Sequence, residues 1–461
     1  MTPPRRQLGL AITAAIVVAN MIGTGVFTGT GFSAAALHDP KSILLLWVVG
    51  GVLALCGAAC YAELGTMMPR AGGEYVYLRE AFHPVVGAMS GWISLTIGFS
   101  APIATSSKLF AGYLAKLLPD IAGTGTQDAI AIALILAITA MHSFDTKLGG
   151  RVQAVFTAFK VALIVVFIGA GFLVGTGSWD HFASEAGGFA NVPTKTFAIQ
   201  LMYVSFAYSG WNAAAYVAGE VENPAKTLPR ALLLGTSIVM ALYILLNIIY
   251  FYALPSSELA GEIEVGAKAA VGLFGPVAGG LVTGLITLAL VSAVSAMVMA
   301  GPRVYASMAA DHALPRQLAY YSKRGVPSVA VAVQGAIAIA FVLAAKIEQL
   351  IELVGFTLAI SAALTVAGLF VLRRRGLRGA YRTFAYPLTP ILFIALSAWI
   401  AYSQIVASWK SSALVALIIA AGAVAYALAP KQQRLAGVDA DDDSGPAPAP
   451  VLPEARTVPK D

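Results

Sequence analysis

Charged residues are scarce in this chain, and their scarcity limits what the protein can be. Of its 461 residues, 11% are Asp, Glu, Lys or Arg, 58% are hydrophobic, and the mean hydropathy is +0.79. Soluble globular domains carry about 25% charged residues. The composition therefore excludes a soluble domain and predicts an all-α integral membrane protein that crosses the bilayer many times.

Cysteine and histidine are also few. Cys56 and Cys60 lack the further Cys or His partners of a metal site, so we expect them to pack in the core. The five histidines fall in predicted loops or at helix ends, at His38, His83, His142, His181 and His312. The chain also lacks a Gly-x-x-x-x-Gly-Lys-Ser/Thr phosphate-binding motif and an intramembrane carboxylate pair. These absences predict no ATP motor, no enzyme activity, no metal and no cofactor.

Apolar stretches long enough to cross a bilayer as helices number about twelve. We number these segments along the chain and place them at about 8–36, 42–66, 85–117, 128–142, 152–175, 195–220, 229–254, 275–308, 327–345, 350–372, 387–407 and 411–429. Segments one and three are longer than a bilayer requires, so each should be interrupted or strongly tilted. Together the segments form one predicted transmembrane domain over residues 1–430.

The basic residues predict the orientation of the chain. Lys and Arg gather in the loops on the side of the N-terminus, so we expect both termini to be cytoplasmic and the protein to lie in the plasma membrane, the inner membrane if the cell is bacterial. This topology, rather than a nucleic-acid partner, explains the net charge of +6. The basic run 373–378 fits a cytoplasmic anchor, with a lipid headgroup site as the alternative. Residues 431–461 are acidic and rich in Pro and Ala, which predicts a disordered tail without a role in the site.

Two apolar segments contain interruptions. Gly23 and Gly25 break segment one, and Ser209 and Gly210 break segment six. Broken backbone is tolerated in a bilayer only where its polar groups face a partner or a wet cavity. The N–H groups after Gly25 would attract a carboxylate, and the carbonyls of the preceding half-helix would attract an ammonium group. The breaks therefore predict a site for a zwitterion; the alternative is that the glycines serve only close helix packing.

The positions of the two breaks indicate an internal repeat. Segments one to five (about 8–175) and six to ten (about 195–372) each begin with a broken helix, and two helices follow at about 387–429. Because each unit has an odd number of helices, the second unit should have inverted topology. This is the five-plus-five arrangement in which broken helices one and six meet near the middle of the membrane.

Five short sequences carry a resemblance to a known family. They are Ile22-Gly23-Thr24-Gly25-Val26-Phe27, Cys60-Tyr61-Ala62-Glu63-Leu64-Gly65 leading to Gly72-Gly73-Glu74-Tyr75, Phe156-Thr157-Ala158-Phe159-Lys160, Phe206-Ala207-Tyr208-Ser209-Gly210-Trp211-Asn212, and Glu220-Val221-Glu222-Asn223-Pro224. Over about residues 8–430 the chain resembles the amino acid–polyamine–organocation (APC) superfamily, and within it the L-type amino acid transporters and their bacterial relatives. The resemblance implies a LeuT-like fold and secondary transport of amino acids by alternating access.

The resemblance also implies roles for individual residues. Thr24 and Gly25 would face the substrate carboxylate, while carbonyls around Met21, Phe206 and Ser209 would take the amine. Phe206 resembles an external gate, with simple packing as the alternative. The complete predicted substrate-binding set is Met21, Ile22, Gly23, Thr24, Gly25, Phe206, Ala207, Ser209 and Gly210.

Lys160 is the clearest cation inside a predicted span. A charge at that depth is costly and usually functional, although a lysine can also extend its side chain to the membrane surface. By resemblance, Lys160 occupies the place of a sodium ion in sodium-coupled relatives and bridges segments one and eight, with Ser292 and Ser295 as neighbours. This predicts sodium-independent transport; a lysine that titrates and carries a coupling proton is the alternative.

The acidic residues narrow the predicted substrate. No Asp lies inside an apolar segment, and Glu63 and Glu220 lie at predicted cytoplasmic helix ends, so we expect no carboxylate near the middle of the membrane. This favours exchange or uptake of neutral L-amino acids over arginine, lysine or polyamines. The alternatives are a proton-coupled amino acid or amine symporter and a non-transporting amino acid sensor. Because no Cys lies in a predicted external loop, a covalently attached accessory subunit is not expected.

Overall fold

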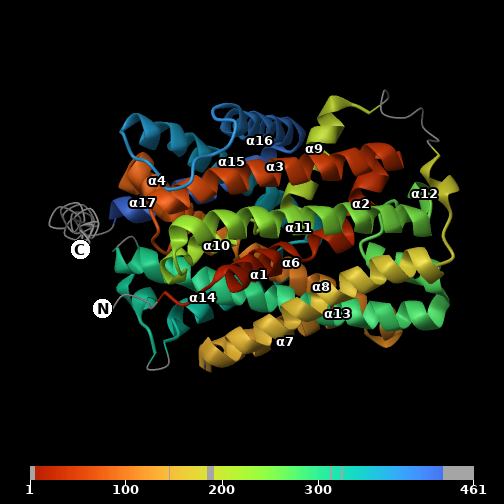
Figure 1. Cartoon of the computed structure of the whole chain (residues 1–461). Helices are drawn as coiled ribbons and strands as arrows, with labels where there is room; N and C mark the ends of the chain where they lie inside the picture. The colour runs from red at the N-terminus through yellow and green to blue at the C-terminus, as the bar shows by residue number, and fades with distance from the viewer. Residues whose placement is uncertain (1–5, 145, 184–191, 312–313, 323–324, 429–461) are drawn as a thin grey trace, which may run out of the picture.

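In the computed structural model, the chain forms a bundle of long helices whose axes run in nearly the same direction (Figure 1). The structure describes residues 6–428 except 145, 184–191, 312–313 and 323–324. The predicted tail at 431–461 lies outside the described residues. Within them, the β-structure consists of one isolated parallel bridge between Leu8 and Val221. The predicted all-α fold class is confirmed.

Ten helical stretches of the described chain are long and apolar enough to cross a membrane. They are α1 (Leu10–Met21) with α2 (Gly25–Leu37), α3 (Pro40–Met67), α5 (Pro84–Ile93) with α6 (Ser100–Leu117), α7 (Thr124–Phe144), α8 (Thr146–Val174), α11 (Pro224–Ala253), α13 (Val265–Ala310), α15 (Ile347–Arg374), α16 (Leu388–Ala407) and α17 (Trp409–Leu428). The other α-helices are α4 (Glu74–Ala81), α9 (Thr194–Ala207), α10 (Ala213–Tyr216), α12 (Ser256–Leu259) and α14 (Ser328–Ala344). The shorter α14 and the interrupted pair α9–α10 are the segments that would complete twelve spans. The number twelve and the inverted repeat stay predictions.

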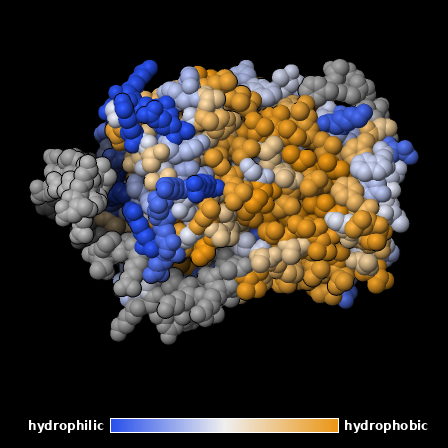
Figure 2. All heavy atoms as spheres, viewed as in Figure 1, coloured by the Kyte–Doolittle hydropathy of each residue, from blue (hydrophilic) through white to orange (hydrophobic). Residues whose placement is uncertain are grey.

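The surface of the bundle is that of a membrane protein. Figure 2 shows apolar residues across the middle of the molecule and hydrophilic residues gathered at the end that carries α4. Large aliphatic side chains are exposed, including Leu173 at 84% and Val277 at 91%. In water such a surface would be unfavourable, whereas in a bilayer it faces acyl chains. The chain is therefore a multi-pass membrane protein.

Both predicted breaks are present. The first separates α1, which ends at Met21, from α2, which begins at Gly25. The second separates α9, which ends at Ala207, from the single turn α10. The third segment is also interrupted, by a π-helical turn at Ser94–Gly98 between α5 and α6. The lengths of segments one and three thus predicted their interruptions correctly.

The two broken segments pack directly against each other. A Cβ atom added to Gly25 would lie 2.2 Å from the Cα of Ala207, and one added to Gly210 would lie 2.7 Å from the carbonyl of Asn20. Gly210 also has a φ of +97°, which side chains with a Cβ rarely adopt. Only glycine at these two positions allows the breaks to touch.

Three segments begin five or more residues earlier than predicted. Segment five was predicted to begin at residue 152, but α8 begins at Thr146. Segment eight was predicted to begin at residue 275, but α13 begins at Val265, because Gly275 with a φ of 76° forms a kink inside a longer helix. Segment seven was predicted to begin at residue 229, but α11 begins at Pro224, which follows Asn223 in a left-handed conformation. Proline is favoured at the first helical position because its missing N–H has no helical partner to lose.

Candidate functional site

Lys160 binds the broken end of the first segment. Its side chain extends from α8, is 1% exposed, and donates hydrogen bonds to the carbonyl oxygens of Ala19 at 2.5 Å and Ile22 at 2.6 Å. The last carbonyls of any helix lack helical partners, and they form the negative end of the helix dipole. The buried ammonium group donates hydrogen bonds to these carbonyls and also places a positive charge at the negative end of the dipole. The alternative, in which Lys160 extends to the membrane surface, is therefore wrong.

Tyr243 joins the two breaks from α11. Its hydroxyl lies 2.5 Å from the carbonyl oxygen of Met21 and 3.3 Å from that of Ala207. The ring is fully buried and packs against Trp47 and Tyr208. The Met21 carbonyl, which we predicted to receive a substrate amine, thus already has a protein donor. Nothing in the sequence spacing distinguishes Tyr243 from other tyrosines in apolar segments, so sequence reasoning missed it.

The start of α2 offers backbone donors. The helix begins at Gly25, and the preceding Thr24 makes no side-chain capping bond. The first N–H groups of a helix have no partner within it, and together with the dipole they favour an anion. Thr24 and Gly25 are both buried, at the contact between the two breaks. This geometry suits the predicted carboxylate position, and the role itself stays a prediction.

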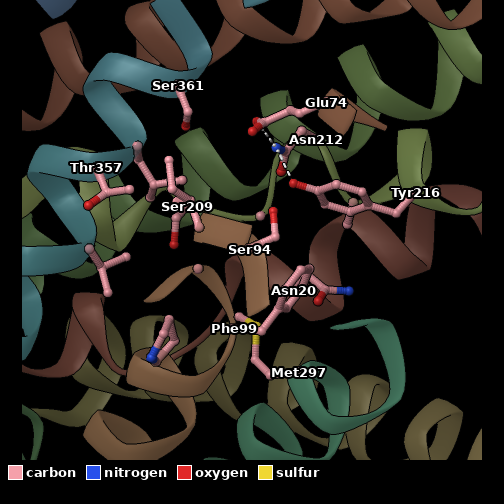
Figure 3. A pocket seen from close by; sticks show the side chains of 17 residues that line it. Asn20, Glu74, Ser94, Phe99, Ser209, Asn212, Tyr216, Met297, Thr357 and Ser361 are labelled. Atoms are coloured by element: carbon pink, nitrogen blue, oxygen red, sulfur yellow. Dashed lines mark hydrogen bonds between the residues drawn. The ribbon is translucent and has the colours of Figure 1, made fainter. Parts of the chain in front are cut away.

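A pocket lies beside the second break (Figure 3). Ser209 and Gly210 line it, together with residues of α1, of the third segment, and of α10, α13 and α15. The other predicted substrate-binding residues, Met21 to Gly25 with Phe206 and Ala207, do not line it. A second pocket shares Glu74, Ser209, Gly210, Asn212 and Leu358 with the first, and its other lining residues are mainly apolar. The structure thus places two of the nine predicted residues on a cavity wall.

Glu74 provides the acidic group of this pocket. Its Oε1 accepts hydrogen bonds from the Tyr61 hydroxyl at 2.7 Å and from the Asn212 amide at 3.0 Å, and Asn212 also donates to the Tyr216 hydroxyl at 2.9 Å. Figure 3 shows Glu74, Asn212 and Tyr216 linked in this way at one end of the pocket. Burial raises the pKa of the Glu74 carboxyl, and hydrogen bonds from Tyr61 and Asn212 oppose that rise.

A carboxylate therefore does line the pocket, whereas the expectation that none lies near the middle of the membrane stays a prediction. Glu74 lines the same pocket as Gly210, because the short helix α4 folds back onto the bundle. Glu63 and Glu220 do lie elsewhere: Glu63 pairs with Arg373 through bonds of 2.8 and 2.6 Å, and Glu220 lies 3.3 Å from Arg303. Sequence reasoning missed Glu74 because a polar stretch between two spans looks like a loop.

One predicted neighbour of Lys160, Ser295, has a histidine partner. The Ser295 hydroxyl lies 2.8 Å from Nε2 of His142, which lies in the last turn of α7 as expected and is buried. The bonds that Lys160 makes reach α1. A Cβ atom on Gly23 would lie 4.0 Å from the Cβ of Ala293, so the first break faces α13 near these serines. The bridge from Lys160 to Ser292 or Ser295 stays a prediction.

Phe206 occupies the last turn of α9 and is 4% exposed. Its carbonyl accepts a hydrogen bond of 3.0 Å from the Ser209 N–H, so this predicted amine acceptor already has one donor. Its side chain lines neither of the two pockets beside the break. The gate role stays a prediction.

Polar residues inside the spans carry a signal that could have extended the predicted site. Asn20 and Asn212 sit within apolar segments, each close to a break, and both line the pocket. A buried amide needs hydrogen-bond partners, so such positions are seldom accidental. Ser94, Thr357 and Ser361 complete the polar wall, but serine and threonine are common in membrane helices and would not have been distinctive.

Comparison with known proteins places this geometry in context. The family model for amino acid permeases matches residues 8–429. The chain is 31% identical over 435 residues to the serine/threonine exchanger SteT of Bacillus subtilis, covering 92% of this chain and 96% of that protein. It is 30% identical over 441 residues to the human b(0,+)-type amino acid transporter 1, covering 93% and 88%. It is 28% identical over 386 residues to the mouse Asc-type amino acid transporter 1, covering 80% and 71%.

Proposed function

This chain belongs to the amino acid permease family of the APC superfamily, and on that premise we propose that it exchanges neutral L-amino acids across the plasma membrane without sodium. Its relatives are transporters, and the chain is a transporter and not an enzyme. In this proposal the two broken segments hold the substrate and alternate its access between the two sides of the membrane.

The contact between Lys160 and α1 carries this proposal. Unwound carbonyls at a broken helix are a natural site for a coupling cation in transporters of this architecture. Here an ammonium group is bonded to the carbonyls of Ala19 and Ile22. A cation that is part of the protein makes a sodium ion at this position unnecessary, so transport should not depend on sodium.

The same contact favours a fixed cation over a proton carrier. Loss of the proton would weaken both hydrogen bonds of Lys160 and leave buried carbonyls of the break without a cationic partner. A buried acceptor that loses its donor costs about 1–3 kcal/mol. We therefore place exchange ahead of proton-coupled symport, which remains the second candidate function.

The substrate class rests on a relative and on the site. One relative is named a serine/threonine exchanger, which supports small neutral substrates and exchange. The N–H groups at Thr24 and Gly25 would take the carboxylate, and carbonyls of the second break beside Ser209 and Gly210 would take the amine. The cytoplasmic position of the termini and transport without an accessory subunit are parts of the same proposal.

Uptake of labelled serine into proteoliposomes that contain this chain alone tests the function. We expect saturable uptake that requires an amino acid inside the vesicles and is inhibited by alanine, serine and leucine. If arginine or putrescine inhibits better than these three, the proposed neutral substrate class is wrong. Binding without any flux would instead identify the chain as a sensor.

A further inference from the structure

Glu74 has no role in the function proposed so far. Its side chain is buried, and it lines both pockets beside the second break. Among the described residues, no Lys, Arg or His forms an ion pair with it. A buried carboxylate is costly unless hydrogen-bond donors or a cation compensate it. Because Glu74 lies in a pocket wall, a ligand in the pocket could supply a hydrogen-bond donor to its carboxylate.

The protein holds this carboxylate in one position. Gly73 has a φ of +52°, and a Cβ atom there would lie 2.4 Å from the Tyr216 ring, so glycine lets the start of α4 press against α10. Tyr61, which donates to Glu74, is itself fixed by edge-to-face contacts with Tyr77 and Trp211. A carboxylate held in this way is pre-organised for one partner and cannot turn away from the pocket.

The Glu74 carboxyl retains acceptor capacity for a ligand. The hydrogen bonds from Tyr61 and Asn212 both reach Oε1, and Ser361 is a third polar neighbour of the carboxyl. Figure 3 shows the carboxylate at the edge of the pocket. In its ionised form a carboxylate accepts several hydrogen bonds and donates none, so its remaining lone pairs recognise a group with a hydrogen-bond donor.

The pocket wall contains two chemically different groups. Ser209 and Gly210 bring the backbone of the second break to the pocket, where the substrate's α-amino group would bind, and the Glu74 carboxyl lines the same pocket. We propose that Glu74 accepts a hydrogen bond from a side-chain hydroxyl of the substrate and makes the carrier prefer short hydroxyl side chains over aliphatic ones. This inference rests on the proposed function and narrows its substrate class.

Four amino acids of similar size test the donor preference in wild-type proteoliposomes. Serine carries a side-chain hydroxyl donor and 2,3-diaminopropionate a side-chain ammonium donor. Alanine has no polar side-chain group, and the methylated oxygen of O-methylserine can only accept a hydrogen bond. We expect kcat/KM for serine to exceed that for alanine and for O-methylserine by about tenfold or more, as expected for a hydrogen bond to a charged acceptor. A higher kcat/KM for diaminopropionate than for serine would contradict the neutral substrate class on which the inference rests. Equal values for all four would overturn the inference.

The variant Glu74→Gln keeps an oxygen for Tyr61 and Asn212 but presents an amide donor to the pocket. Its preference for serine over alanine should fall by about tenfold or more, and the kcat/KM for O-methylserine should rise relative to that for serine. Glu80→Gln, on the same helix and outside both pockets, is the matched control and should keep the wild-type preference. An unchanged preference in a Glu74→Gln protein that transports alanine normally would overturn the inference.

If Glu74→Gln does not fold, Tyr61→Phe provides the second variant, since it removes one of the hydrogen bonds that hold the carboxylate. Its serine preference should also fall, and an unchanged preference would count against the inference. Failure of the proposed function looks different, because wild-type protein would then transport none of the four amino acids.

Discussion

Lys160 and Tyr243 divide between them the carbonyl groups that the break in segment one leaves without helical partners. Lys160 donates hydrogen bonds to the carbonyls of Ala19 and Ile22, and the Tyr243 hydroxyl donates one to the carbonyl of Met21. In a bilayer these groups have no water to bind, so each unsatisfied carbonyl would cost several kcal/mol. At the scale of single residues, the break is possible because two side chains from other helices replace the missing backbone bonds.

Tyr243→Phe should therefore weaken the contact between the two breaks. The ring would remain, but the Met21 carbonyl would lose its donor, at a cost of about 1–3 kcal/mol. We expect a lower melting temperature of the purified protein and slower exchange, measured by thermal unfolding and by uptake into proteoliposomes.

Tyr250→Phe is the matched control on the same helix. Tyr250 is equally buried, but its hydroxyl has no hydrogen-bond partner among the described residues, so its removal should be neutral or slightly stabilising. Equal stability and transport in the two variants would contradict the assigned role of Tyr243.

The broken segments work as a pair of elements. α2 packs on α9, and α1 packs on α10 and α11, so the two interruptions meet inside the bundle. The contact between Gly25 and Ala207 is backbone to backbone. The two readings of the glycines, as openings for a ligand and as sites of close packing, are thus compatible, because the packing is what brings the two breaks together.

Gly25→Ala should separate these elements. The added methyl group would lie 2.2 Å from the Cα of Ala207, which the backbone can relieve only by moving. We expect substrate affinity to fall by about tenfold or more, since the geometry of a binding site tolerates little displacement. Gly280→Ala, where a methyl group meets nothing within 4 Å, should bind substrate normally. Retained affinity in Gly25→Ala would show that the first break does not shape the site.

The sequence predicted some elements better than others for physical reasons. Glycines such as Gly23 and Gly25 inside an apolar run are a local signal, so both breaks were predictable. Glu74 was not, because its burial depends on α4 folding back against α10 and α15, which no local pattern encodes. Gly275 shows the opposite error: a Gly-Pro pair that usually starts a helix lies at a kink within α13. Tertiary packing therefore decided the position of Glu74, whereas the error at Gly275 came from reading a local Gly-Pro signal as a helix start.

At the scale of the whole molecule, hydrophilic residues gather at the end of the bundle that carries α4 (Figure 2). Arg79 of α4 pairs with Asp311 at 2.7 Å, and Glu63 pairs with Arg373 at 2.6 Å. The apolar middle holds Lys160, whose partners among the described residues are carbonyls and not a carboxylate. A molecule with a built-in cation at its broken helix should exchange substrates without help from an ion gradient.

Uptake into proteoliposomes with sodium and proton gradients imposed separately tests this account most directly. The account predicts that wild-type exchange is unchanged when choline replaces sodium and is insensitive to a proton gradient. It also predicts that Lys160→Met abolishes exchange, whereas the exposed-lysine control Lys410→Ala, on α17, retains it. Accumulation driven by a proton gradient would show that Lys160 titrates during transport and is not a fixed cation. Accumulation driven by sodium would contradict the role assigned to Lys160 altogether.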